Sequence, residues 1–441
     1  MRIVPLTKAT AEKILAARRG RDLAAERVAA RIVSGVRRRG DAALLAWGRR
    51  LDALAVPSAR ELWVGARAIR GTRRELRPEL LRAVRHAARN IRRVAERQKP
   101  LPWMLEVEPG VRVGQMVRPL DTIGCYIPGG RFSLVSTLLM TVIPAQVAGV
   151  RRIVVACPRP NAAFLAAANL LGVREIARIG GAQAVAALAY GTETIPRVDK
   201  IFGPGNRYVT AAKRLVSADC AIDMLAGPTE VLILASRGNP RFIAADLLAQ
   251  AEHDPHAIPV FITTSRELAR AVQQELKCQL RMLAEGNCAA RSLARNGWIL
   301  LAPGLDAAVE FANRFTPEHL SLPGGEPDLL RQVEAAGAVF LGRWSAQPFG
   351  DYASGANHVL PTGGWARARG GLSVADYVKC SSVQRVSRAG FRRLAPVARA
   401  LADAEGLAAH GRAVAVREKS AAELCKTWME ARKEKMTEGI A

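Results

Sequence analysis

The chain has 441 residues, 49% of them apolar and 5% aromatic, so it is long enough for two or more domains with well-buried cores. It lacks the run of roughly eighteen apolar residues that a membrane-spanning helix needs, and Pro5 and Lys8 interrupt any signal-peptide core. We therefore expect a cytoplasmic protein without a membrane span. Seven scattered cysteines, with no CxxC spacing, argue against a disulfide framework and a thiolate zinc site.

The formal net charge is +26, and residues 1–100 carry 26 Lys and Arg against 9 Asp and Glu, a net of +17. Clustered cations can bind the phosphates of nucleic acids. These arginines instead alternate with Ala and Leu at helical spacing and lack interleaved aromatic residues. The pattern favours solvated helix faces over a nucleic-acid surface, and in either case polyanionic ligands would be attracted over a long range.

The first 100 residues are predicted to be mostly helical, at 23–40, 41–52 and 72–98. From Arg152 the pattern changes to apolar strands that alternate with helices. The strands are predicted at 152–157, 175–180 and 199–203, and the helices at 161–172, 182–191 and 206–218. This repeated order predicts a parallel sheet covered by helices, with ligands at the carboxyl ends of its strands.

The alternation begins again after Ala226-Gly227-Pro228, which predicts a second α/β domain. Its strands are predicted at 230–236, 259–264, 298–302 and 338–342, and its helices at 241–253, from Arg266 onward and at 305–315. A loop-rich stretch at 343–371 and a charged helical tail from about 385 follow. The fold class that we expect is α/β, with two Rossmann-like domains whose parallel sheets are covered by helices, a helical N-terminal region and a helical C-terminal tail for dimerisation.

Three short stretches hold three of the six histidines together with carboxylates: QAEHDP (250–255), TPEHL (316–320) and GDYASGANHVLP (350–361). Gln250 and His253 are spaced to share one face of a helix that Pro255 ends. An isolated pair of this kind is more often a histidine that satisfies the last helix carbonyls. With Asp351 from a glycine-flanked loop, however, the pair would offer nitrogen and oxygen ligands that suit Zn²⁺.

Glu318 and His319 are adjacent, and neighbouring side chains of an extended strand point to opposite faces. Pro317 favours a turn that enters the strand, and a bent backbone can present both groups to one cavity. A carboxylate beside an imidazole permits two separate proton transfers near neutral pH. A surface pair in a turn is the alternative that the local sequence leaves open.

No GxGxxG fingerprint is present in the first predicted sheet. The segments Gly180-Gly181-Ala182-Gln183 and Gly203-Pro204-Gly205-Asn206 each lie where a strand leads into a helix. Free amides at such a junction can hold a pyrophosphate. Ordinary strand-to-helix turns also use Gly and Asn, so dinucleotide binding and a plain turn both stay open.

A similarity to a known family runs from about residue 25 to 415, and the stretches most specific for that family are spread over this range. They are YIPGG (126–130), IPAQVAGV (143–150), GGAQAVAALAYGT (180–192), FGPGNRYV (202–209), DMLAGPTEVLILA (223–235), LLAQAEHDP (247–255), TPEHL (316–320) and GDYASGANHVLPTGG (350–364). Together they resemble the histidinol dehydrogenase family, the zinc- and NAD-dependent enzymes that complete histidine biosynthesis. The chain departs from the family at FSLVSTLLMT (132–141), and has Thr229 where the family commonly has Ser.

The resemblance implies a role for three sets of residues. One Zn²⁺ per subunit would be held by Gln250, His253, Asp351 and, from the partner subunit, His410. Glu318 and His319 would be the catalytic acid/base residues, and Tyr126, Gln183 and Asn206 would contact NAD. The substrate would be bound by Thr229, Gln250, His253, His319, Asp351, His358, Glu405 and His410, with Glu405 facing its amino group.

The reaction that the resemblance implies is the oxidation of L-histidinol to L-histidine through L-histidinaldehyde, with two NAD⁺ and a water, in a homodimer that shares its active sites. His319 can take the hydroxyl proton, Glu318 can activate water, and a cofactor must carry the hydride. Zinc would orient the substrate and polarise its oxygen. Cysteine catalysis is not expected, and Cys125, beside Tyr126, is its single candidate.

The predicted division of the chain has four parts. Residues 1–21 form a segment that packs with the C-terminal tail, and residues 22–125 with 231–372 form a first α/β domain with the zinc and catalytic residues. Residues 126–230 form a second α/β domain that contacts NAD, and residues 373–441 form a helical dimerisation tail.

Three alternatives stay open at this point: a zinc- and NAD-dependent dehydrogenase of another small alcohol, such as a sulfonated diol, a zinc hydrolase, and a nucleic-acid-binding module. The presence of His358, Glu405 and His410 favours histidinol as the substrate. The paired α/β domains with amide-rich turns argue against a hydrolase.

Overall fold

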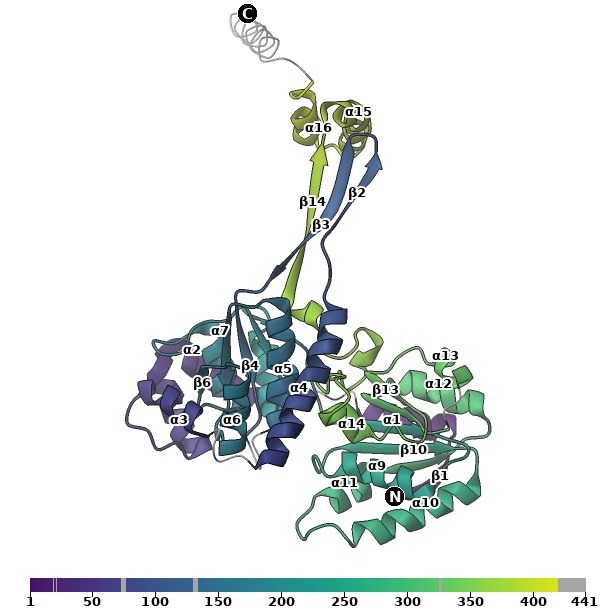
Figure 1. The fold of residues 1–441 in the computed structure, drawn as a ribbon. Helices are drawn as coiled ribbons and strands as arrows, with labels where there is room; N and C mark the ends of the chain where they lie inside the picture. Colours follow the sequence, from purple (N-terminus) through teal and green to yellow (C-terminus); the bar gives the residue numbers. More distant parts are fainter. Residues whose placement is uncertain (19, 21, 73–76, 130–133, 325–326, 419–441) are drawn as a thin grey trace, which may run out of the picture. The chain divides into compact units, whose positions relative to one another are not determined.

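The computed structural model describes residues 1–441 except 19, 21, 73–76, 130–133, 325–326 and 419–441 (Figure 1). The chain divides into two compact units. Unit 1 comprises Met1–Lys99 and Pro119–Val378, and unit 2 comprises Pro100–Arg118 and Lys379–Ala441. Unit 1 contains two parallel sheets, and unit 2 contains a three-stranded sheet with two helices.

The first sheet of unit 1 has five parallel strands in the order β6-β5-β4-β7-β8. They are β4 (Thr122–Tyr126), β5 (Arg152–Ala156), β6 (Glu175–Ala177), β7 (Lys200–Phe202) and β8 (Ala221–Ile222). The helices that follow its strands are α5 (Val135–Ala148), α6 (Ala162–Leu170), α7 (Gly181–Tyr190) and α8 (Arg207–Val216). The chain adds strands on one side of β4 and then on the other, so the strand order reverses between β4 and β7. Ligands bind at the carboxyl edge of such a reversal in open α/β sheets.

The second sheet has six parallel strands in the order β1-β11-β10-β9-β12-β13. They are β1 (Arg2–Pro5), β9 (Glu230–Leu234), β10 (Ile258–Thr263), β11 (Trp298–Leu301), β12 (His319–Leu322) and β13 (Ala338–Leu341). Every residue of β9 is buried, as expected of an apolar strand that is covered on both faces. Helices α1 (Lys8–Ala17) and α12 (Leu305–Phe315) pack on one face, and α9 (Pro240–Ala251), α10 (Arg266–Leu280) and α11 (Ala289–Asn296) pack on the other. The predicted fold class is confirmed.

After α1, further described helices precede the first strand of the five-stranded sheet. They are α2 (Leu23–Asp52), the 3-10 turn η1 (Ala59–Leu62), α3 (Ala66–Gly71) and α4 (Pro78–Gln98). The two helices predicted at 23–40 and 41–52 are joined as α2, with a bend at Gly40, whose φ is 48°. Pro78 stands in the first turn of α4, where its missing amide hydrogen costs nothing, so the helix predicted from residue 72 begins only there.

The helices of the N-terminal part cover the five-stranded sheet. Helix α2 shares a core with α7 and α8, and α4 shares one with α5 and α6. The predicted division of the chain had placed residues 22–125 in one domain with the six-stranded sheet. Residues 1–21 supply β1, which pairs in parallel with β11, and α1. The packing of this segment with a C-terminal tail stays a prediction.

The N-terminal region is mostly helical, as predicted, but two strands were not predicted: β1, ahead of its helices, and β14 (Val378–Val386), within residues 373–441, which were predicted to be a helical tail. Strand β1 was missed because four residues ahead of a helix show no period, and β14 was missed because its side chains are mostly exposed. Strand β14 lies beside β3 (Val111–Pro119), which pairs with β2 (Trp103–Glu108) in an antiparallel hairpin.

The described tail continues as two helices in unit 2. These are α15 (Arg388–Ala404) and α16 (Ala408–Ala415). The helix predicted beyond residue 418 lies outside the described residues. None of the helices within the described ranges is both long and apolar enough to cross a membrane.

A buried ion pair holds the turn that follows β7. The ammonium of Lys213 on α8 contacts the carboxylate of Asp223, and the two side chains are 3% and 0% exposed. Lys213 also donates to the carbonyl of Gly203 at 3.0 Å. The amide of Gly203 in turn donates to Asp223 at 2.7 Å. Removing one member of such a pair leaves an uncompensated buried charge.

We predict that Lys213→Met lowers the free energy of unfolding by about 3–5 kcal/mol, because Asp223 would stay buried without its cation. Urea denaturation measures the change. The matched control is Arg82→Met, which breaks an exposed pair with Glu79 and should leave the midpoint almost unchanged. Equal midpoints for Lys213→Met and the parent would contradict the prediction.

Candidate functional site

Glu318 and His319 lie at the amino end of β12, beside the amino end of β9. Sequence reasoning placed ligands at the carboxyl ends of strands, so this position is unexpected for the six-stranded sheet. Thr316 ends α12 with a left-handed φ of 47°, and Pro317 follows before β12 begins. The bent backbone brings a Glu318 carboxylate oxygen and Nδ1 of His319 to 3.5 Å from each other.

One oxygen of the Glu318 carboxylate is held firmly. Its Oε2 accepts from the hydroxyl of Thr229 at 2.6 Å and from the backbone amide of Glu230 at 2.7 Å. Its Oε1 makes no hydrogen bond to another described residue, although the whole residue is only 6% exposed. The carboxylate is therefore oriented by one oxygen and can act through the other.

The imidazole of His319 is oriented in a similar way. Its Nδ1 lies 3.0 Å from the carbonyl oxygen of Glu230, so Nδ1 carries the hydrogen and Nε2 is the basic atom. Nε2 lies 3.9 Å from Oδ1 of Asp351. Burial lowers the pKa of His319, but the carboxylates of Glu318 and Asp351 and the carbonyl of Glu230 raise it more, so the net shift is upward. The site thus favours an imidazolium once Nε2 takes a proton.

Gln250 and His253 lie where α9 leads into the turn before β10. The helix ends at Ala251, two residues earlier than predicted, so His253 stands in the turn and is exposed. The amide of Gln250 is fully buried: it donates to the hydroxyl of Thr229 and accepts from the side-chain amide of Gln347. Gln250 and Glu318 therefore share Thr229 as a hydrogen-bond partner.

Asp351 belongs to a short helix, α14 (Gln347–Tyr352), rather than to the predicted loop. Pro348 in the first turn favours the helix because it has no amide hydrogen to lose. The backbone amide of Gln347 donates to Asp246 on α9, and the side chain of Gln347 donates to Gln250. These two bonds tie α14 to α9.

His358 connects the two halves of unit 1. Its Nδ1 lies 3.0 Å from the backbone oxygen of Asp351, and its Nε2 lies 3.1 Å from the hydroxyl of Thr137 on α5. Burial lowers the pKa of His358; Asp351 opposes this shift, while the nearby imidazoles of His319 and His253 add to it, and the net shift is downward. A neutral His358 with fixed partners follows from these contacts.

Tyr126, Gln183 and Asn206 lie at the carboxyl edge of the five-stranded sheet, near the reversal of strand order. The hydroxyl of Tyr126 accepts from the amide of Gly181 at 3.2 Å, and burial raises the pKa of this tyrosine. Gly203 passes so close that an added Cβ would lie 2.0 Å from the carbonyl oxygen of Tyr126. Only glycine fits at this position.

Several amides at this edge already have acceptors within the protein. Asn206 caps α8 by accepting from Tyr208 and Val209 at 3.0 and 3.1 Å. Gln183 donates to Asp52 at 2.8 Å, and burial raises the pKa of this carboxyl. The other amide atom, Oε1 of Gln183, is buried without a hydrogen-bond partner in the described part of the chain. A bound ligand with a donor would satisfy it.

The chain matches the model of the family described as histidinol dehydrogenase over residues 16–418. The chain belongs to the histidinol dehydrogenase family. It is 48% identical over 388 residues to the histidinol dehydrogenase of Methanothermobacter thermautotrophicus, covering 86% of this chain and 90% of the relative. It is 46% identical over 398 residues to that of Geobacter sulfurreducens, covering 89% and 93%.

A solved structure agrees with this assignment. The crystal structure of histidinol dehydrogenase from Elizabethkingia anophelis matches with a TM-score of 0.88 at 36% identity, over 95% of this chain and 98% of that one. The predicted family, and with it an NAD-dependent dehydrogenase, is confirmed. The alternative of a dehydrogenase for another small alcohol gains no support.

The residues predicted to bind zinc are divided between the two units. Gln250, His253 and Asp351 lie in unit 1, and His410 lies in unit 2 on α16. Within the described ranges, no group of three or more His, Cys, Asp or Glu is arranged to hold a metal ion. The predicted ligands in unit 1 are one imidazole, one carboxylate and one amide. The amide is not a His, Cys, Asp or Glu side chain, so such a group would not include it.

These donors are of the kinds that hold a cation, and two side-chain groups among or beside them have no protein partner. The imidazole of His253 makes no hydrogen bond to any residue that the structure describes. The Oε1 atom of Gln347, whose amide contacts Gln250, is buried without a partner among those residues. Nitrogen and oxygen donors of this kind suit Zn²⁺.

Three residues of this site were missed by sequence reasoning: Glu230, Gln347 and Thr137. Their contacts join segments that are far apart in the chain, and no local pattern marks them. Thr137 lies in residues 132–141, where the chain departs from the histidinol dehydrogenase pattern. Residues 132 and 133 of this segment fall outside the described residues. Cys125 is fully buried with its pKa raised to about 12, so it is a poor nucleophile.

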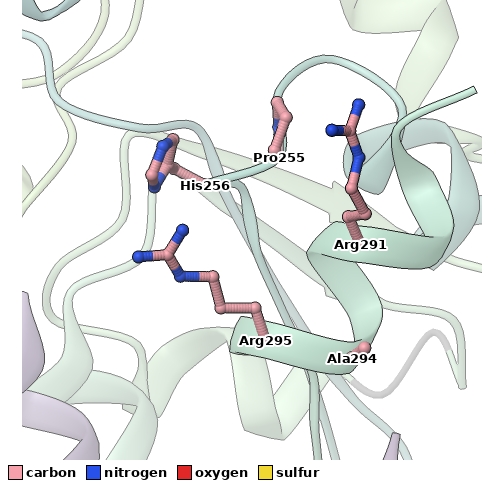
Figure 2. Close-up of a pocket in the computed structure, with 5 residues that line it drawn as sticks. All are labelled: Pro255, His256, Arg291, Ala294 and Arg295. Atoms are coloured by element: carbon pink, nitrogen blue, oxygen red, sulfur yellow. The ribbon is translucent and has the colours of Figure 1, made fainter.

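A surface pocket lies beside the turn that carries His253 (Figure 2). It is lined by Pro255, His256, Arg291, Ala294 and Arg295. Figure 2 shows the two arginines projecting from α11 on the side of Pro255 and His256. None of the residues predicted for catalysis, metal or cofactor lines it.

Burial raises the pKa of Asp246 from 3.8 to about 6, and the amide of Gln347 opposes the shift. A carboxyl whose pKa is raised by folding stabilises the protein below its unfolded pKa, and this contribution is lost as pH rises through the folded value. We predict that Asp246→Asn is more stable than the parent at about pH 8, by up to about 3 kcal/mol, and that the difference shrinks toward about pH 4. Urea denaturation in the presence of a chelator measures it. A difference that does not vary with pH would contradict the prediction.

Proposed function

We propose that this protein oxidises L-histidinol to L-histidine through L-histidinaldehyde, with two NAD⁺ and one water, as the last step of histidine biosynthesis. Membership of the histidinol dehydrogenase family over residues 16–418 supports the reaction. The observation that carries it in this chain is the backbone of Glu230, which holds Glu318 and His319 together. Each of them keeps one reactive atom, Oε1 and Nε2.

The first oxidation needs a base for the hydroxyl proton. Nε2 of His319 takes this proton while the hydride leaves the same carbinol group. The imidazolium that forms is stabilised by Glu318 at 3.5 Å and Asp351 at 3.9 Å, and its Nδ1–H remains bonded to the carbonyl of Glu230. NAD⁺ supplies the hydride acceptor, since no side chain can store a hydride.

The second oxidation needs a base for water. Oε1 of Glu318 takes a proton from the water that attacks the aldehyde carbon, so the water oxygen becomes part of the carboxylate. Thr229 and the amide of Glu230 hold Oε2 during this step, which keeps Oε1 aimed in one direction. A second hydride then leaves the hydrated aldehyde. General base catalysis of this kind contributes typically about 100- to 10,000-fold.

We assign one Zn²⁺ per subunit to Gln250, His253, Asp351 and the partner subunit's His410. The exposed imidazole of His253, which has no hydrogen bond to a described residue, supports its place in this set. When bound, the metal supplies a Lewis acid that polarises the reacting oxygen and a template for the imidazole and amine of the substrate. His358 and Thr229 would contact the substrate from unit 1, and Glu405 and His410 of the partner subunit would contact it as well.

We assign NAD to the carboxyl edge of the five-stranded sheet, at Tyr126, Gln183 and Asn206. The buried, unpartnered Oε1 of Gln183 supports this position, and so does the reversal of strand order between β4 and β7. Because Asn206 already caps the amides at the start of α8, side chains rather than that helix end would make the polar contacts to the cofactor there.

We propose a homodimer in the cytoplasm. Unit 2 exposes a set of large apolar side chains on β2 and α15, each between 45% and 59% exposed: Trp103, Met104, Leu105, Val107, Val397 and Leu401. Large apolar side chains that stay exposed on so small a unit favour a protein interface. A second copy of the chain would cover it and supply His410 and Glu405 to each site. Scattered cysteines without paired spacing suit a reducing compartment.

The function is tested by supplying L-histidinol and NAD⁺ to the zinc-loaded protein and counting NADH. Two NADH should form for each histidine, and chelation should abolish turnover. Glu318→Gln should still form the first NADH and should slow the second by about 100-fold or more, because Gln cannot accept a proton from water. Stopped-flow absorbance separates the two steps.

The matched control is Glu310→Gln, an exposed glutamate on α12 whose substitution should leave both steps at the parent rate. A fully metallated parent protein that leaves L-histidinol unchanged would overturn the proposed function. Equal slowing of both steps in Glu318→Gln would overturn only the role of Glu318.

The shared metal site is tested by mixing two inactive variants. His253→Asn and His410→Asn should each lose zinc and activity. After subunit exchange, half of the dimers carry one copy of each variant and hold one intact site, so about a quarter of the parent activity should return. Zinc content and NADH formation measure this recovery. No recovery, in a sample shown by sedimentation to have exchanged subunits, would contradict a ligand from the partner.

A further inference from the structure

Glu230 contacts both proposed catalytic residues through its backbone. Its amide donates to Oε2 of Glu318 at 2.7 Å, and its carbonyl accepts from Nδ1 of His319 at 3.0 Å. The residue is the first of β9, which lies between β10 and β12 in the sheet. A small displacement of this one residue would therefore move the carboxylate and the imidazole at the same time.

The side chain of Glu230 is fixed by Arg18, which follows α1. The guanidinium forms a two-point contact, from Nε to Oε1 at 2.8 Å and from Nη2 to Oε2 at 2.6 Å. The two side chains are 4% and 2% exposed. The amide of Gly363 donates to Oε1 at 3.2 Å as well. The described donors to this carboxylate are therefore Arg18 and Gly363, and both lie far from Glu230 in the sequence.

Arg18 also reaches the segment that carries Glu318. Its Nη1 donates to the carbonyl of Phe315, the last residue of α12, and its guanidinium carbon lies 3.6 Å from the centre of the Phe315 ring. Thr316 and Pro317 then lead directly into Glu318. One planar group thus holds the start of β9 and the turn before β12 at a fixed separation. A planar fork can do this, whereas the single point charge of a lysine cannot.

Stability alone does not account for this ion pair. Removing two charges from water costs about as much as their attraction returns, and apolar side chains of similar volume commonly serve as well. The exposed pair between Glu12 and Arg314 already joins α1 to α12 without that cost. What the buried pair adds is direction: it fixes where the peptide of Glu230 points.

We infer that Arg18 and Glu230 are positioning residues, which set Oε1 of Glu318 and Nε2 of His319 for the two successive proton transfers. The inference rests on the function proposed above. Because the same peptide orients both groups, loss of the pair slows both oxidations by a similar factor. This distinguishes it from Glu318→Gln, which slows only the second.

The test uses the zinc-loaded, full-length protein and the double variant Arg18→Met/Glu230→Gln, which leaves no buried charge unpaired. The first oxidation is followed from L-histidinol in a single turnover, and the second from L-histidinaldehyde supplied directly. Both rate constants should fall by about 10- to 100-fold, since a misplacement of about 1 Å has an effect of that size. The KM for histidinol and the zinc content should stay within about threefold.

The matched control is Glu12→Gln/Arg314→Met. This double variant removes the exposed pair between α1 and α12 and should keep the parent rates. A pair with a structural role alone would lower the thermal midpoint and the fraction of active subunits, but not the rate constants of the folded subunits. Active-site titration with NAD⁺ and histidinol separates these outcomes.

Arg18→Lys decides the matter if the double variant does not fold, because it keeps the charge and loses the fork. It should slow both oxidations by about tenfold. Parent rate constants for both oxidations in either folded variant overturn the inference and leave the proposed function intact. A parent protein that does not oxidise histidinol overturns both.

Discussion

The peptide of Glu230 is the constraint on which the site depends. Glu318 and His319 stand next to each other at the start of β12, where an ideal strand would send their side chains to opposite faces. A backbone amide and carbonyl from the neighbouring strand bind one side chain each, and so hold them in one place. The burial of all of β9 makes this anchor rigid, because a strand packed on both faces has no room to shift.

The two sheets of unit 1 use opposite edges. Tyr126, Gln183 and Asn206 lie at the carboxyl edge of the five-stranded sheet, as expected of an α/β fold. Glu318, His319 and the end of α9 lie at the amino edge of the six-stranded sheet instead. The segments that enter β9, β10 and β12 therefore carry the polar groups there, and Thr316 and Pro317 provide the bend that an entering segment needs.

Much of the fold was predictable because most strands are buried on both faces and each is followed by a helix with a period of its own. Strands β1 and β14 were not predictable: the first is short, and the second is mostly exposed and has no apolar period. At the site, Pro317 correctly indicated a bend beside Glu318. The partners that hold the site could not be predicted, since Arg18 and Glu230 are 212 positions apart and Gln250 and Gln347 are 97 apart. Such contacts follow from tertiary packing and not from spacing.

The segment that follows α14 limits how far the two sheets of unit 1 can move apart. His358 bonds to Thr137, Asn357 donates to the carbonyl of Met140 and Tyr377 donates to that of Thr141, so this segment is fastened to α5 at three points. Val359 and Tyr377 are buried in the core of the five-stranded sheet. The two sheets cannot move apart as rigid bodies unless these three hydrogen bonds break and Val359 and Tyr377 leave that core. Any opening between the two sheets therefore requires a local rearrangement of this segment and not a rigid-body hinge.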